Sequence, residues 1–198
     1  MILKRTSYTL IIAAVLVSCK QTNEELINEG VDLAKRKKYK EAIRLYTKVI
    51  NRNNKLQLAY YDRGFSLIAL KDYSKALTDF NKVMALQTHG DFTYTENPNT
   101  PFASEEARMQ VPYNDALYLR AQVKYYMDSI KSSFQDFQTL VDNNYKEKSN
   151  CIVWQGTICV RNGSKDKACE YFQEAKTIAS NDEDRQDADE YVNQYCPK

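Results

Sequence analysis

The stretch from Tyr60 to Val83, YYDRGFSLIALKDYSKALTDFNKV, holds small, apolar and aromatic residues in an arrangement that returns along the chain at a nearly fixed spacing. Its positions here are Gly64, Leu67, Ala76, Phe80 and Val83. Thirty-four positions earlier, the same places hold Gly30, Leu33, Ala42, Tyr46 and Val49. Later in the chain they hold Gly156, Cys159, Ala168, Phe172 and Ala175, and in a looser copy Ala121, Lys124, Ser133, Phe137 and Leu140. The sequence therefore contains four copies of one unit.

The residue types of the unit predict a pair of packed helices. A small residue at the eighth place and an Ala twelve residues later let two helices approach closely, where larger side chains would hold them apart. The aromatic residue four positions after that Ala lies one turn further along the same face. There it can fill the gap to the next unit.

This pattern resembles the tetratricopeptide repeat, which has a period of about 34 residues and small and aromatic residues at set places. The resemblance covers residues 23 to 180 and implies an all-α superhelix of four helix-turn-helix repeats with a C-terminal capping helix. The chain departs from the family because it lacks a Trp at the fourth place and a closing Pro. We therefore expect helix ends at Asn-rich turns such as Asn51, Asn53 and Asn54.

The predicted repeat domain spans residues 24–198. Its repeats cover about residues 24–50, 56–86, 113–143 and 150–178, and a polar capping helix covers about 182–195. The period breaks at residues 87–112, which combine turn formers with aromatic residues. This insertion is either a binding element or a packing flap over the groove, and Ser104 in it is suited to cap a short helix.

The N-terminus has the features of an export signal. Lys4 and Arg5 precede an apolar run that is too short for a permanent membrane span, and residues 1–18 end before Cys19. Leu16-Val17-Ser18-Cys19 resembles a bacterial lipobox, which implies lipidation of Cys19 and a short tether over residues 19–23. The alternative is an ordinary signal peptide with an incidental Cys. The resemblance implies a lipoprotein of Bacteroidota type, anchored in the cell envelope and sorted to the outer membrane.

Charge argues against nucleic acid as a partner. The chain has 28 basic and 26 acidic residues, and loss of residues 1–18 removes two basic residues and no acid, which leaves 26 of each. A formally neutral chain does not imply a basic face that would argue for nucleic acid as a partner. The basic run from Lys35 to Lys38 is either a solvated turn or a contact to anionic lipid near the anchor.

The residue inventory does not support an enzyme. His89 is the single histidine, and five glycines form no phosphate-binding loop. The acidic pairs lie where solvation and helix dipoles explain them. We therefore expect no catalytic residues, no metal site and no cofactor.

Four cysteines besides Cys19 lie in the last repeat and the cap: Cys151, Cys159, Cys169 and Cys196. An exported protein can oxidise them, and four cysteines allow three pairings. In a stack of this kind, the capping helix lies as the first helix of a fifth repeat would. This implies a disulfide between Cys169 and Cys196, with Cys159 as the alternative partner and Cys151 as a free buried thiol.

The resemblance also implies a binding surface. In tetratricopeptide repeats the first helix of each pair lines a concave groove that holds a peptide or a partner helix. The corresponding positions are Tyr61, Phe65 and Ile68, then Tyr118, Gln122 and Tyr125, then Val153, Thr157 and Val160, with Ile27, Val31 and Ala34 in the first repeat. The family's Lys, Asn and Arg set for a C-terminal carboxylate is absent, which argues against recognition of chaperone tails. The insertion or the cap could instead cover these residues.

Two functions follow from these observations. The first is a membrane-anchored scaffold that binds a protein or peptide partner of the cell envelope in the groove. The alternative is a carbohydrate- or nutrient-binding accessory lipoprotein that uses the many Tyr residues. Asp128-Ser129-Ile130 also resembles a signal for O-glycosylation at Ser129, although Ser129 is equally suited to cap the next helix.

Overall fold

The computed structural model describes residues 21–88, 99 and 103–196, which form ten helices. The expected signal peptide, Cys19 and His89 lie outside the described residues. The helices are α1 (Asn23–Lys35), α2 (Tyr39–Arg52), α3 (Gln57–Ala69), α4 (Tyr73–Thr88), α5 (Glu105–Arg108), α6 (Tyr113–Tyr126), α7 (Ile130–Asp142), α8 (Lys148–Arg161), α9 (Lys165–Ile178) and α10 (Asp182–Tyr195). No helix in this part of the chain has the length and apolar character needed to cross a membrane.

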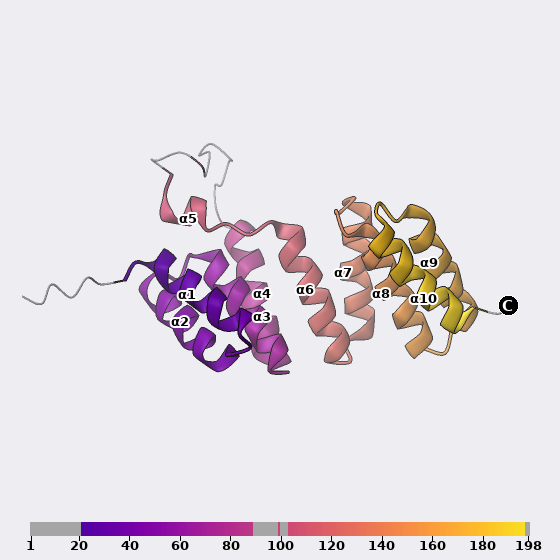
Figure 1. The fold of residues 1–198 in the computed structure, drawn as a ribbon, viewed down its shortest axis with the longest axis horizontal. Coiled ribbons are helices and arrows are strands. Elements are labelled where there is room, and N and C mark those ends of the chain that lie inside the picture. Colours follow the sequence, from indigo (N-terminus) through magenta and orange to yellow (C-terminus); the bar gives the residue numbers. More distant parts are fainter. Residues whose placement is uncertain (1–20, 89–98, 100–102, 197–198) are drawn as a thin grey trace, which may run out of the picture.

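The helices form four pairs that follow one another along the long axis, from α1 and α2 at one end to α8 and α9 near the other (Figure 1). Each helix packs on its partner within the pair and on the neighbouring pair. α10 packs on both α8 and α9, as the first helix of a fifth pair would. The prediction of an all-α superhelix of four helix-turn-helix repeats and a capping helix is confirmed. The fourth pair starts at Lys148, two residues before the predicted boundary at 150.

The repeated glycine and aromatic residue touch within each pair. A Cβ atom added to Gly30 would lie 2.5 Å from the Tyr46 ring, and one added to Gly156 would lie 2.4 Å from the Phe172 ring. Both rings are fully buried, as are Phe80 and Phe137 at the same place. The aromatic residue therefore fixes the distance between the two helices of its own repeat. In the third and fourth repeats it also contacts the next unit, as predicted, because Phe137 stacks on Trp154 and Phe172 stacks on Tyr191.

The third repeat has polar residues, Ser133 and Lys124, at two places that are apolar in the other repeats. Each of them has a hydrogen-bonding or ionic partner of its own. The Ser133 hydroxyl donates a hydrogen bond of 2.7 Å to the backbone carbonyl of Ala121 in the facing helix. The Lys124 ammonium lies 2.7 Å from the Asp136 carboxylate, which the Arg120 guanidinium also contacts at 2.8 Å. These bonds satisfy the buried polar groups and cross-link α6 to α7.

The helix ends agree with the prediction of Asn-rich turns only in part. Five helices are followed, two positions after their last residue, by a residue with positive φ. These residues are Lys37 after α1, Lys71 after α3, Asp128 after α6, Asn144 after α7 and Gly163 after α8. After α3, the N–H of Lys71 donates to the Ile68 carbonyl and the N–H of Asp72 to the Leu67 carbonyl. This pair of bonds is the Schellman motif, and it recurs at all five ends. The predicted Asn turn does end α2, where Asn53 is the C-cap, and Asn144 takes the positive φ after α7. At the other four ends a Lys, Asp or Gly takes this conformation, so Asn-rich turns are not the general way in which these helices end.

The described part of the insertion packs on the start of α3. Ser104 caps α5 as predicted, since its hydroxyl accepts the Ala107 N–H at 3.1 Å. The Leu58 N–H donates to the Met109 carbonyl at 3.0 Å, and both Met109 and Val111 are buried in the main core. Residues 103–112 are thus a packing segment. The insertion aromatics Phe92, Tyr94 and Phe102 lie outside the described residues.

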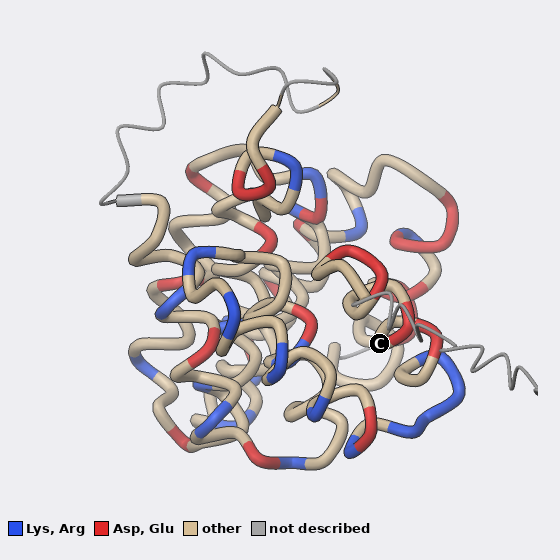
Figure 2. Tube along the Cα trace, turned by 90° about the vertical axis from the view of Figure 1, so that its left-hand side faces the viewer, with Lys and Arg blue, Asp and Glu red and all other residues tan. Residues whose placement is uncertain are grey.

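Charged residues of both signs are interspersed over the turns at the N-terminal end of the stack (Figure 2). In the basic run, Lys35 lies in the last turn of α1 and Lys37 takes the left-handed conformation that ends the helix. Cations at this place offset the partial negative charge of a helix C-terminus. The run therefore has a structural reason to be basic.

Candidate functional site

The predicted groove residues of the second repeat share one face of α3 but differ in exposure. Phe65 is 52% exposed, the largest exposure among the bulky apolar residues of the described chain. Tyr61 is partly buried and its ring meets the Phe80 ring edge to face at 6.1 Å. Ile68 packs against the same core cluster. Phe65 is therefore the free apolar contact on this helix, whereas Tyr61 also has a packing role that the sequence did not predict.

The first repeat does not contribute a free groove surface. Ile27 is 2% exposed and belongs to the main core, and Val31 and Ala34 pack against that core. The expectation that these residues face a ligand is wrong for Ile27, because it is buried in the main core.

The groove face of the third repeat is occupied by ring-to-ring contacts. The Tyr118 ring lies 6.0 Å from Phe137 and 5.9 Å from Tyr145. Burial raises the pKa of Tyr118, and hydrogen bonding with Trp154 opposes the rise. Gln122 is partly buried one turn further along α6. Tyr118 is therefore mainly a packing residue, and its hydroxyl is engaged by Trp154 and Gln122.

Trp154 is the centre of an aromatic cluster that joins the third and fourth repeats. It stacks on Phe137 with ring centroids 5.6 Å apart and an angle of 7°. Tyr125 and Tyr126 meet it edge to face at 5.3 Å and 6.2 Å. Offset and edge-to-face pairs of this kind stabilise beyond simple burial. The cluster holds α6 and α8 in a fixed relation.

A pocket of about 260 Å³ lies next to this cluster, between α6, α8 and α10. We call it the cap pocket. Three of its lining residues were predicted for the groove: Tyr125, Val153 and Thr157. The other four were not predicted: Asn150, Trp154, Asp187 and Tyr191. The structure thus brings together groove residues of two repeats and completes the site with the capping helix.

The spacing of the repeats could have predicted the two pocket residues of α10, Asp187 and Tyr191. Asp187 lies 34 positions after Val153, and Tyr191 lies 34 positions after Thr157. A fifth, incomplete copy of the unit would have placed both on the groove face. The prediction treated this helix as a solvent-facing polar cap because its charge dominated the pattern.

A second feature of the first-helix face is a buried carboxyl group. Asp62 of α3 has an oxygen, Oδ2, that is shielded from solvent and has no hydrogen-bond partner. Burial raises its pKa to about 7. The neighbouring Arg63 is instead paired, because its Nε and Nη2 donate to the two oxygens of Asp79 at 2.8 Å and 2.7 Å.

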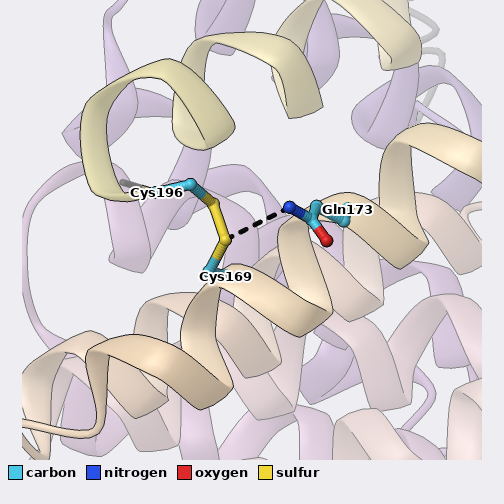
Figure 3. Close-up of a disulfide and its surroundings, with 3 residues drawn as sticks. All are labelled: Cys169, Gln173 and Cys196. Atoms are coloured by element: carbon cyan, nitrogen blue, oxygen red, sulfur yellow. Dashed lines mark hydrogen bonds between the residues drawn. A yellow bond between two sulfur atoms is a disulfide. The ribbon is translucent and has the colours of Figure 1, made fainter. Parts of the chain in front are cut away.

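The structure joins Cys169 and Cys196, the pair expected from the sequence, with Cα atoms 5.2 Å apart (Figure 3). The bond connects the start of α9 to the end of α10, and the Gln173 side chain lies over the Cys169 sulfur at 3.5 Å. Cys151 and Cys159 are free and buried. Burial raises the pKa of the Cys151 thiol to about 12.

Ser129 stands at the start of α7 but its side chain makes no capping hydrogen bond. The plain capping role considered for it is therefore wrong. The side chain is exposed, and Asp128 before it pairs with Arg161 at 2.9 Å. O-glycosylation at Ser129 stays a prediction.

The fold and the first-helix face define a tetratricopeptide repeat superhelix. The family model described as tetratricopeptide repeat matches residues 150–182, which cover most of the fourth pair and reach the start of α10. Solved structures match over most of the chain. MamA from Desulfovibrio magneticus RS-1, residues 41 to the end, has a TM-score of 0.63 at 21% identity over 80% of this chain and 76% of its own.

Two further structures have the same fold. YrrB, described as a TPR protein with an unusual peptide-binding site, has a TM-score of 0.59 at 17% identity over 88% of this chain and 76% of its own. The first TPR of Spaghetti (RPAP3), bound to the HSP90 peptide SRMEEVD, has a TM-score of 0.54 at 19% identity over 72% of this chain and 94% of its own. At these identities the likeness shows the fold. No curated protein matches the chain significantly.

Proposed function

We propose that this chain is a membrane-anchored scaffold that binds a protein or peptide partner along the face of its first helices. The observation that carries the proposal is the combination, on that face, of the exposed Phe65 ring and the cap pocket. Aromatic side chains and the pockets that receive a partner's side chains dominate interface energetics. Two structures of the same fold, YrrB and the first TPR of Spaghetti, are described with peptide-binding sites or a bound peptide.

The chemistry of this face differs from that of a site for acidic tails. Its exposed or partly buried residues in the second and third repeats are apolar, aromatic or amide, as in Phe65, Gln122 and Tyr125. The Lys, Asn and Arg set that would hold a terminal carboxylate is absent. The partner is therefore an apolar or aromatic segment rather than a peptide of the SRMEEVD type.

Capture from cross-linked cell envelopes tests the scaffold. The wild-type chain should retain a defined protein partner, and Phe65→Ala should reduce retention by about tenfold or more. Ile178→Ala is the matched control, because Ile178 is also an exposed apolar residue, 38% exposed, but lies on the second helix α9. Unchanged helical circular dichroism shows that both variants fold. Equal retention by Phe65→Ala and wild type would reject this face. Binding to a glycan array without a captured protein would favour the carbohydrate-binding alternative.

The anchor is tested separately. A diacylated Cys19 buries many CH₂ groups at about 0.8 kcal/mol each, which gives durable attachment to the outer membrane of the cell envelope. Cys19→Ala should therefore appear unprocessed or in the soluble fraction. Quantitative recovery of that variant in washed membranes would show that the anchor assignment is wrong.

A further inference from the structure

Two polar side chains of α8 present hydrogen-bond acceptors to the cap pocket. The amide nitrogen of Asn150 donates to Glu147 at 3.1 Å and to Asp184 at 3.2 Å. Carboxylates accept only, so these two bonds fix the orientation of the amide and leave the Asn150 Oδ1 as an acceptor. The Thr157 hydroxyl donates its proton to the Val153 carbonyl at 2.9 Å, which leaves its lone pairs free.

The carboxylate of Asp187 adds a negative charge to the same pocket. Asp187 is exposed on α10 and has no ion-pair partner within the described chain, unlike Asp182 and Asp189 on the same helix, which pair with Arg185 and Lys176. The Asp187 carboxylate lies close enough to Tyr191 to raise the pKa of that lining residue, after the larger effects of burial and Tyr195. A site with an unpaired carboxylate and acceptor oxygens favours a donor-only cation.

The remaining walls are aromatic. Tyr125, Trp154 and Tyr191 contribute rings to the pocket. Ring faces attract cations within about 6 Å of the centroid. The protein already uses this attraction beside the pocket, because the Arg161 guanidinium carbon lies 4.9 Å over the Tyr125 ring. Arg161 itself is held by the Tyr125 carbonyl and by Asp128.

The volume limits the occupant. Sites for drug-sized ligands have about 300–1,000 Å³, whereas the cap pocket has about 260 Å³. It therefore suits one side chain. Of the side chains that carry only donors, Lys and Arg combine an apolar stem for Val153 and the rings with a charged end for Asp187.

We propose that the cap pocket binds one Lys or Arg side chain of the partner segment. The inference rests on the proposed function, since the pocket lies on the same first-helix face as Phe65. The inference adds a charge requirement to the proposed function, because the partner segment must carry a basic residue beside its apolar contacts. The capping helix is then part of the binding site as well as the end of the stack.

A titration with short blocked peptides tests the charge requirement directly. The probes are acetylated pentapeptide amides of four Ala residues with Arg, Lys, norleucine or Glu at the centre. Trp154 is the single Trp of the chain and lines the pocket, so its fluorescence and its indole N–H resonance both report occupancy. The Arg and Lys peptides should give saturable changes in both signals, and the norleucine and Glu peptides should give none. Binding should weaken as the salt concentration rises.

Two variants of α10 separate pocket binding from a general charge effect. Asp187→Asn should weaken the Arg peptide by about three- to fivefold, the upper part of the range for an exposed charge pair. Glu183→Gln removes the same charge from the same helix, but Glu183 lies in the first turn of α10 and outside the pocket lining, so this variant should change the affinity less than twofold. Equal binding of the norleucine and Arg peptides, equal effects of the two variants, or no response to any peptide would overturn the proposal. Capture of an envelope partner that depends on Phe65 but not on Asp187 would overturn it while leaving the scaffold function intact.

Discussion

The Phe80 ring occupies the space that a Cβ atom on Gly64 would need. Such an atom would lie 2.8 Å from the Cζ of Phe80 and 2.9 Å from its Cε1. Both residues are buried at the crossing of α3 and α4. The glycine is therefore required by the packing of its own repeat, and the Schellman turn that follows brings the two helices back to this contact.

Gly64→Ala should destabilise the protein although Ala is the better helix former. Overpacking costs about 1–3 kcal/mol, whereas the gain in helix propensity is about 1 kcal/mol. Urea unfolding should show a net loss of stability. Phe80→Leu alone should also destabilise, because it removes ring contacts from the core. In the double variant the smaller Leu side chain makes room for the added methyl group. Its loss of unfolding free energy should therefore be smaller than the sum of the losses of the two single variants. Strict additivity would show that the ring is not the obstacle.

The contacts of this kind explain why the fold was predictable from sequence. Gly64 and Phe80 are 16 residues apart, and the same pair occurs as Gly30 with Tyr46 and as Gly156 with Phe172. Because each repeat needs the same contact between a glycine and an aromatic ring, the pair recurs in the sequence with the period of the repeats. The insertion and the disulfide lie outside the period. The disulfide pair was still expected, because the repeat arrangement placed the end of α10 beside the start of α9.

The cap pocket could be predicted only in part. Tyr125, Val153 and Thr157 followed from the periodic groove positions, but Asp187 and Tyr191 lie on a helix whose acidic composition concealed its alignment with the repeats. The burial of Ile27 was missed for a different reason. Groove positions of the first helix in the stack meet the next repeat on one side, and the periodic pattern does not show how much each repeat covers its neighbour.

Lys71 should be a site where glycine stabilises the protein. It has a φ of 61° and an exposed side chain without an ion-pair partner in the described structure. Left-handed backbone costs an ordinary residue about 1–2 kcal/mol. Lys71→Gly should therefore raise the free energy of unfolding by about 1 kcal/mol or slightly less, because glycine also adds entropy to the unfolded chain.

Gly163 supplies the reciprocal test of the same backbone effect. It has a φ of 78°, and a Cβ atom there would meet nothing within 4 Å. Gly163→Ala should then lower stability by about 1 kcal/mol through backbone strain alone. Chemical denaturation of both variants measures the two effects. If Lys71→Gly were destabilising, the side chain would have a stabilising contact that outweighs the strain.

The buried Asp62 carboxyl should make stability fall as the pH rises. Its folded-state pKa is raised to about 7, against roughly 3.9 in an unfolded chain. Between these values the folded state binds the proton more tightly, so stability is greatest below about pH 4, is lost progressively toward pH 7, and is then level as far as this group is concerned. Asp62→Asn removes the charge and should gain stability relative to wild type across this window.

Urea midpoints measured from pH 4 to pH 8 compare Asp62→Asn with Asp32→Asn, which changes an exposed acid of α1. The difference between Asp62→Asn and wild type should grow with pH, whereas the difference for Asp32→Asn should not. Parallel curves for all three proteins would show that the Asp62 carboxyl is solvated and ionised throughout.

The Cys169 to Cys196 disulfide should stabilise the cap pocket as well as the chain. Cross-linking residues 27 positions apart contributes about 3–4 kcal/mol in the loop-entropy model. α10 is the last helix of the stack and packs on one side only, on α9 and α8, so without the bond it should fray first. Because α10 supplies Asp187 and Tyr191 to the pocket, reduction should lower thermal stability and weaken binding of the Arg peptide together. Trypsin cleavage at Arg185, within α10, reports the fraying directly.

The double variant Cys169→Ser/Cys196→Ser should behave like the reduced wild type and should not respond further to reductant. In the chain from Lys20 onward, alkylation of unfolded but unreduced protein should label Cys151 and Cys159 alone, and neither should react in the folded state because both are buried. Labelling of four thiols, or a mapped peptide that joins Cys159 to Cys196, would contradict the pairing. A reduced protein that keeps full affinity for the Arg peptide would show that α10 holds its place by packing alone.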